Sequence, residues 1–337
     1  MADLSTTYMG IPLKNPLILG ASNLVMKPET IKQLEDAGIA AIVYKSLFEE
    51  QIQLETLQLD EDLSEYENRF AEMSRLFPSI EHAGPKEHLM KLKKLKEMVS
   101  IPVIGSLNAV YEPTWVEYAR EMEKTGIDGL EINLYAIPGY FEVTGQFLEE
   151  KQLETIKSVK QALHIPVSVK VSPFYTNTLN FIKQADEAGA DAYVLFNRFF
   201  QPEIDTEKEE YYYPWELTHP QDHMLSLRYA GLLYGNLDGS VCISRGLYTA
   251  EDVIRAILAG ADTVQIVSTI YKNQPPVVKE ILEGISRWME KKNYASLADF
   301  RGKLSRKTLN DPFVYQRAQY VDILAKSESI FKKFPMI

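Results

Sequence analysis

Short apolar runs alternate with amphipathic stretches along most of the chain. Eight such runs can be placed, near residues 17–22, 41–46, 102–107, 129–134, 167–172, 192–197, 240–245 and 263–268. Each run is nearly continuous in apolar residues instead of alternating with polar ones, which is typical of parallel strands buried on both faces. The pattern therefore predicts eight parallel strands.

The stretches between these runs predict crossover helices, at 28–37, 87–99, 115–124, 179–188 and 250–258 among others. One short sequence motif recurs where a helical stretch meets an apolar run: a glycine followed by two small, apolar or acidic residues. Its glycines are Gly38, Gly126, Gly189 and Gly260. A glycine can adopt the left-handed conformation that ends a helix, so the motif predicts four helix-to-strand junctions.

Eight strand–helix units in one chain of 337 residues favour a closed (β/α)8 TIM barrel, an α/β fold, as a single domain over residues 1–304. The alternative is a large open α/β sheet. Two connections, 47–84 and 198–222, follow predicted strands 2 and 6 and exceed the usual βα loop length, which is typical of lids or binding loops. Residues 305–337 are expected to form a C-terminal extension packed on the barrel.

The charge and composition of the chain limit the classes of partner and cofactor that it can bind. Lys and Arg total 36 against 47 Asp and Glu, and a net charge of -11 argues against nucleic acid. No stretch is apolar enough for a membrane span, and one cysteine, Cys242, allows neither an internal disulfide nor an iron–sulfur cluster held by this chain alone. A soluble, cytoplasmic protein is expected. We expect no metal site, since Pro220 disfavours a helix between His219 and His223.

Polar residues close the predicted strands, where the active site of a barrel lies. They include Lys45 and Lys170, on strands otherwise suited to burial, and the asparagines Asn108, Asn133 and Asn197. A buried lysine is costly unless it meets an anion or an electron-rich acceptor. Two lysines with three asparagines therefore favour a planar polar ligand such as an isoalloxazine ring, although each residue singly could be a rim lysine or a loop cap.

A phosphate site is predicted at the ends of strands seven and eight, where this fold commonly binds phosphate. The candidates are Arg245 and Gly246 after strand seven, and Ser268 and Thr269 after strand eight. The alternative for each pair is an ordinary surface turn. No glycine fingerprint of a dinucleotide site is present, so FMN is expected in preference to FAD.

Over residues 7 to about 304, these motifs in this order resemble the dihydroorotate dehydrogenase family. The resemblance rests on the segments 15–16 with 21–22, 44–46, 131–134, 169–171, 197, 246–249, 265–266 and 297–304. It implies FMN as the cofactor and oxidation of dihydroorotate to orotate in pyrimidine biosynthesis. Family members without a membrane helix are soluble and often homodimeric, so a homodimer is expected here, and a separate electron-transfer partner is possible.

The resemblance also implies roles for individual residues. Lys45 and Asn133 would act in catalysis, and Lys45, Asn133 and Asn197 would face a small planar substrate. The cofactor set implied by the resemblance and the strand ends is Ala21, Ser22, Lys45, Ser46, Asn108, Asn133, Lys170, Asn197, Arg245, Gly246, Ser268 and Thr269.

Three departures from the family concern the substrate side and the phosphate. The family's cysteine or serine base is replaced by Ala136, which leaves Tyr135 as a candidate base. The family's Asn-x-x-Gly-Leu-x-Asn loop has no counterpart between Leu47 and Gly84, and Arg245 stands where the family has a glycine. These departures leave room for three alternatives: another small planar substrate, a phosphate-binding lyase using Lys170, or a flavin-binding protein without catalysis.

Overall fold

Eight parallel strands close into a barrel in the computed structural model, which describes residues 2–53, 85–110, 112–135, 141–199, 201–214 and 216–326. The barrel strands are β3 (Leu17–Leu19), β4 (Ala41–Val43), β6 (Val103–Asn108), β7 (Gly129–Asn133), β8 (Val167–Val171), β9 (Ala192–Leu195), β12 (Ser240–Ser244) and β13 (Thr263–Ile266). Each strand is hydrogen-bonded in parallel to the next, and the pairings β13–β3 and β4–β6 complete the ring. The predicted (β/α)8 barrel is confirmed.

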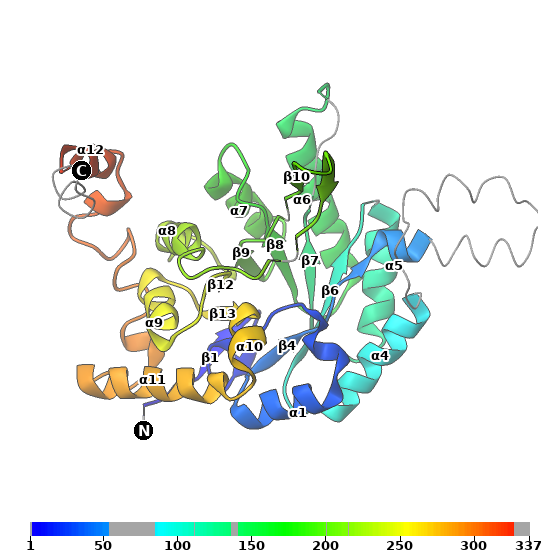
Figure 1. Cartoon of the computed structure of the whole chain (residues 1–337), viewed down its shortest axis with the longest axis horizontal. Coiled ribbons are helices and arrows are strands. Elements are labelled where there is room, and N and C mark those ends of the chain that lie inside the picture. Colours follow the sequence, from blue (N-terminus) through cyan, green and yellow to red (C-terminus); the bar gives the residue numbers. More distant parts are fainter. Residues whose placement is uncertain are drawn as a thin grey trace, which may run out of the picture.

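Helices surround the strands (Figure 1). They are α1 (Pro28–Ala37), α4 (Pro85–Met98), α5 (Glu112–Glu123), α6 (Gly145–Ala162), α7 (Thr178–Glu187), α8 (Met224–Leu233), α9 (Ala250–Ala259), α10 (Ser268–Asn273) and α11 (Val277–Lys292). The predicted glycine junctions are present: Gly38 ends α1 at a φ of 105° and Gly189 follows α7 at a φ of 98°. These left-handed glycines turn the chain from each helix into the next strand.

The core consists of the strand side chains and the inner faces of the helices. Ile31 and Leu34 of α1, like Ile42 of β4, have no exposed surface. Burying a side chain of this size stabilises the fold by about 1.5–3 kcal/mol. Tyr8, in the hairpin of β1 (Thr6–Tyr8) and β2 (Ile11–Leu13), is also buried. It packs with Ile18, Val43 and Cys242 in a second apolar cluster.

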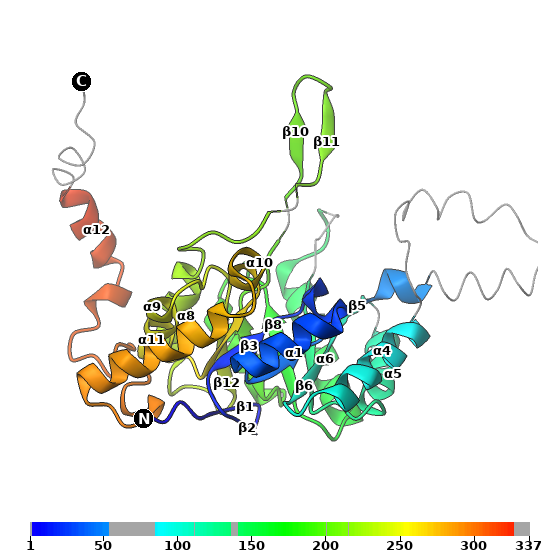
Figure 2. The same cartoon turned by 60° about the horizontal axis from the view of Figure 1, so that its bottom comes forward.

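The connection after β9 contains a second hairpin, β10 (Glu203–Asp205) and β11 (Glu210–Tyr212), which forms a sheet of its own. It extends away from the barrel (Figure 2). The other long connection begins with β5 (Leu47–Phe48), which pairs with the end of β6. Residues 54–84 of that connection lie outside the described residues, as do Ala136 and the polar cluster 67–69.

The C-terminal extension has two parts among the described residues. The segment up to η3 (Phe313–Tyr315) contacts the barrel, since Ser305 is buried and Arg228 of α8 donates to the carbonyl of Tyr315. Helix α12 (Ala318–Ala325) has no buried residue and extends away from the barrel (Figure 2). Residues 327–337 of the predicted extension lie outside the described residues. In the part of the chain that the structure describes, no helix combines the length and apolarity that crossing a bilayer requires.

Candidate active site

A cavity of about 590 Å³ opens at the carboxyl ends of the barrel strands. All but one of the predicted site residues line it, namely Ala21, Ser22, Lys45, Ser46, Asn108, Asn133, Tyr135, Lys170, Asn197, Arg245, Gly246 and Ser268. Thr269 is the exception: it is buried, and its hydroxyl donates to the carbonyl of Tyr248. The barrel thus brings together residues spread over almost 250 positions of sequence, because parallel strands end at one rim.

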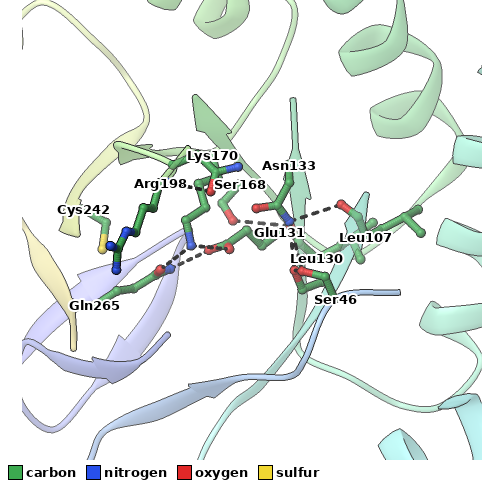
Figure 3. A network of polar contacts seen from close by, with 12 residues as sticks. Ser46, Leu107, Leu130, Glu131, Asn133, Ser168, Lys170, Arg198, Cys242 and Gln265 are labelled. Carbon is green, nitrogen blue, oxygen red and sulfur yellow. Dashed lines mark hydrogen bonds and ion pairs between the residues drawn. The ribbon is translucent and has the colours of Figure 1, made fainter. Parts of the chain in front are cut away.

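The floor of the cavity is a closed ring of three buried side chains (Figure 3). The Lys170 ammonium lies 3.4 Å from Oε1 of Glu131 and 3.2 Å from Oε1 of Gln265. Gln265 in turn donates through Nε2 to Oε2 of Glu131. Strand pairing explains how the ring forms, since β7 and β8 are neighbours and pair Glu131 with Ser168 and Asn133 with Lys170.

Beside the floor, an amide and two hydroxyls form a second cluster (Figure 3). Asn133 donates through Nδ2 to Oγ of Ser106 at 2.9 Å and to the carbonyl of Leu107 at 3.2 Å, and Ser46 and Ser106 share a hydrogen bond of 2.6 Å. These contacts orient the Asn133 amide, whose oxygen remains an acceptor for a ligand.

At the other end of the cavity, donors converge from three connections. The Gly246 amide donates to Oγ1 of Thr218, and Oγ of Ser268 accepts from both the amide and the hydroxyl of Thr218. His223, which is buried, contacts the Gly246 carbonyl through Nδ1 at 2.9 Å. Helix α9 begins just beyond, with a capping box between Thr249 and Asp252. Backbone amides, hydroxyls and a helix N-terminus are the groups that hold phosphate in barrels.

Arg245 stands at this end in a backbone conformation that is rare for a residue with a side chain. Its φ is 78°, followed by 63° at Gly246. Burial lowers the pKa of its guanidinium; the Asp222 carboxylate acts in the opposite direction, and the positive charge of Arg198 adds to the lowering. Its Nε is buried, with no hydrogen-bond partner among the described residues. A strained, partly desolvated cation with an unpaired donor is suited to an anionic ligand.

Tyr135, which lines the cavity, belongs to a cluster of three aromatic rings. Tyr135 stacks on Phe199 with ring centroids 4.4 Å apart, and Phe199 meets Phe174 edge-on at 5.3 Å. Burial raises the pKa of the Tyr135 phenol above its ordinary value. The phenol is therefore neutral near pH 7 and is a weak proton acceptor.

The lining carries more positive than negative charge, although the whole chain is acidic. Four described lining residues are cationic, Lys45, Lys170, Arg198 and Arg245, whereas Glu216 is the acidic residue of the described lining. Arg198 and Glu216 approach to 3.8 Å. A local excess of cations in a chain of net charge -11 concentrates anions at this cavity.

Several members of the site were not singled out as site residues from the sequence. Gln265 entered only as part of the segment 265–266 that carries the family resemblance. Thr218 lies in a long connection without a strand-end signal, and Arg198 follows Asn197 at a strand end where only the asparagine was considered. Glu131 lies inside an apolar run. That position was the only indication in the sequence that it has a role, because a carboxylate in a strand buried on both faces needs a partner. Cys242, expected to be a core residue, is buried within the barrel, and burial raises the pKa of its thiol to about 12.

A comparison with protein-family models matches residues 79–289 to the family described as dihydroorotate dehydrogenase. The chain belongs to the dihydroorotate dehydrogenase family. It is 27% identical over 308 residues to the catalytic subunit of dihydroorotate dehydrogenase B (NAD(+)) of Thermoplasma acidophilum, covering 90% of this chain and 99% of that protein. The corresponding catalytic subunit of Pyrococcus abyssi is 28% identical, over 89% of this chain and 98% of its own length.

A protein of Aeropyrum pernix named putative dihydroorotate dehydrogenase A (fumarate) is 25% identical, over 90% of this chain and 98% of its own. The predicted family is confirmed, and with it the class of reaction. This member of the dihydroorotate dehydrogenase family is an oxidoreductase that acts on CH–CH groups.

Proposed function

We propose that the protein uses FMN to oxidise a small planar substrate at a CH–CH bond. The observation that carries the proposal is one continuous cavity, with cationic and amide groups at the floor and a cup of amide and hydroxyl donors at the ends of β12 and β13. That arrangement suits a ligand with a polar ring at one end and a phosphate at the other.

Two buried polar atoms lack hydrogen-bond partners, and FMN fits these residues if it can supply both partners. Nε of Arg245 and Oγ of Ser22 are buried at the cavity without a partner among the described residues. An unpaired buried donor costs about 1–3 kcal/mol, so a ligand that pairs with both is stabilised by that amount at each atom. A phosphate oxygen beside Arg245 and a polar atom of the flavin beside Ser22 would supply these partners.

Each residue then has a stated task. Arg245 and Ser268 would hold the phosphate, Gly246 and Thr218 would exchange hydrogen bonds they now make within the cup for ones to it, and buried Thr269 would support the cup. The flavin ring and ribityl chain lie against the rest of the cofactor set: Ala21, Ser22, Lys45, Ser46, Asn108, Asn133, Lys170 and Asn197.

Bound FMN would accept a hydride from one carbon of the substrate's CH–CH bond. The neighbouring carbon must lose a proton, which requires a base. Asn133 and Asn197 would orient the substrate in the cavity, and Lys45 would offset negative charge on substrate and cofactor. Ala136 stands where the family has its proton acceptor, so we propose that dihydroorotate itself is a poor substrate and that another small planar compound is preferred.

The lyase alternative is disfavoured by the contacts of Lys170. Glu131 and Gln265 already accept hydrogen bonds from its amine. A Schiff-base lysine needs a neutral, unpaired amine to attack a carbonyl. Holding and orienting a ligand is the role that these contacts favour.

Electrons must leave the reduced cofactor, and we propose a separate electron-transfer partner. The single cysteine, Cys242, is buried in the barrel, so this chain alone cannot ligate an iron–sulfur cluster. Several relatives are named catalytic subunits, which supports a division of labour between chains. A homodimer of this chain is proposed as well, on the family resemblance alone.

The test is the absorbance spectrum of the purified protein, followed by mass identification of the released cofactor. We expect flavin bands from one non-covalent FMN per chain. Anaerobic addition of dihydroorotate or of other small cyclic CH–CH compounds then reports a substrate by bleaching. A colourless protein that cannot be reconstituted with FMN would refute the proposal, and flavin that no reductant substrate bleaches would favour a binding protein without catalysis.

A further inference from the structure

The ring formed by Lys170, Glu131 and Gln265 contains two residues that the proposed chemistry does not use, Glu131 and Gln265. Glu131 has no exposed surface and does not line the cavity, whereas its two partners do. Each carboxylate oxygen of Glu131 contacts one partner: Oε1 lies 3.4 Å from the Lys170 ammonium, and Oε2 accepts from Nε2 of Gln265. The carboxylate is thus held from both sides.

The ring engages two of the three N–H groups of Lys170 and leaves one available for a ligand. An ammonium has three N–H groups, and those of Lys170 reach Oε1 of Glu131 and Oε1 of Gln265. One N–H remains for a ligand in the cavity. Because Nε2 of Gln265 is committed to Glu131, its amide oxygen is fixed toward Lys170, and the ammonium cannot rotate without losing a bond.

The ring also determines how much positive charge a ligand in the cavity experiences from Lys170. A lysine and a carboxylate in contact have no net charge as a pair. A ligand above Lys170 therefore interacts with the positive end of an N–H dipole and not with an uncompensated cation. Inside a barrel, where the effective dielectric constant is well below that of water, this difference is large. Removing one partner of a buried pair leaves the other charge uncompensated.

We propose that Glu131 and Gln265 are positioning residues which limit the positive charge that Lys170 presents to the cavity, and so tune the reduction potential of the bound FMN. The inference rests on the proposed function, since it needs FMN above Lys170. Reduction adds negative charge to the flavin ring. An uncompensated ammonium stabilises that charge more than a paired one does, so the carboxylate holds the potential down.

Two substitutions of nearly constant shape test this by sign. Glu131→Gln removes the compensating charge and should favour reduced over oxidised FMN by about tenfold, which for a two-electron couple is about 30 mV upward. Gln265→Leu removes the amide oxygen beside Lys170 and the donor that holds Glu131, so it should also shift the potential upward, by less than Glu131→Gln does. Glu131→Asp keeps the charge and should restore most of the wild-type value.

The measurement is the midpoint potential of the protein-bound FMN, equilibrated with reference dyes, together with far-ultraviolet circular dichroism of each variant. The control is Glu283→Gln on the outer face of α11, a change of equal charge at a half-exposed side chain. It should leave the potential unchanged.

Upward shifts in both floor variants support the inference, whereas unchanged or lowered potentials overturn it. If Glu131→Gln does not fold, Gln265→Leu decides alone: a raised potential supports the inference and an unchanged or lowered one overturns it. A wild-type protein that binds no FMN overturns the proposed function, and with it this inference. Bound FMN with unmoved potentials overturns the inference only.

Discussion

The two ends of the cavity are built from different kinds of structure. The phosphate end is made by tight turns between regular elements: Gly246 lies between β12 and α9, and Ser268 opens α10 directly after β13. At the other end, Tyr135 lines the cavity and packs in an aromatic cluster with Phe174 and Phe199, each from a different connection. Short connections between a strand and a helix allow little variation, whereas long ones accept new side chains without disturbing the barrel.

This contrast matches the chemistry that each end would perform. The proposed phosphate end has hydroxyl and amide groups that suit a phosphate, and Arg245 adds a cation there. On the substrate side, the sequence has Ala136 where the family resemblance implies a proton acceptor. The chain is therefore expected to retain the cofactor of its family more faithfully than the substrate of its family.

The largest expected effect concerns the substrate end. Dihydroorotate should reduce the flavin about 10² to 10⁴ times more slowly than an otherwise intact site with a positioned base would allow, because Ala136 cannot accept a proton. Ala136→Ser and Ala136→Cys should raise the rate if the substrate binds. Anaerobic stopped-flow bleaching of the flavin measures it. Fast bleaching of the wild type would show that another residue is the base.

A smaller effect is expected at the floor. Lys170→Ala should weaken FMN binding by about 1.5–3 kcal/mol, the value of a charge-assisted hydrogen bond. Lys45→Ala should weaken it less, because we assign Lys45 to cofactor and substrate together and Lys170 to the cofactor alone. Fluorescence titration of the apoprotein with FMN gives both constants. Equal affinity of wild type and Lys170→Ala would contradict the assignment.

The contribution of the proposed phosphate end to cofactor binding can be distinguished from that of the floor by comparing FMN with riboflavin, which lacks the phosphate. Arg245→Ala should weaken FMN binding about tenfold, the loss of one charged hydrogen bond, and should leave riboflavin binding unchanged. Arg245→Lys, which keeps the charge, is the matched control and should lie between. If Arg245→Ala weakened both ligands alike, the side chain would serve the loop and not the phosphate.

The smallest effect is expected at Tyr135. Since burial raises the pKa of its phenol above the ordinary value of about 10, the phenol stays protonated between about pH 6 and pH 9. Tyr135→Phe should therefore change the rate on the preferred substrate by less than about twofold, with the same pH profile, because the stack on Phe199 is kept. A rate that rises with pH in wild type and is lost in Tyr135→Phe would instead identify Tyr135 as the base.

Much of the fold could be derived from periodicity. The eight apolar runs coincide with the barrel strands to within about three residues, and α1 occupies the predicted 28–37. Strands buried on both faces must be apolar throughout, and glycine is favoured where a helix must reverse, so these signals are local and strong. The polar residue closing each strand was also visible, because in a barrel that position faces the site.

What the sequence could not determine is how those residues pair. Strand order and register place Glu131 beneath Lys170 and beside Gln265, although Glu131 and Gln265 are 134 positions apart. The same holds for Thr218, which reaches Ser268 from a long connection, and for the stack of Tyr135 on Phe199. Local pattern dictated the barrel and the rim on which its chemistry lies, since apolar burial and helix ends are properties of neighbouring residues. Tertiary structure alone decided which charge meets which, because charges interact through space over distances that only the closed barrel defines.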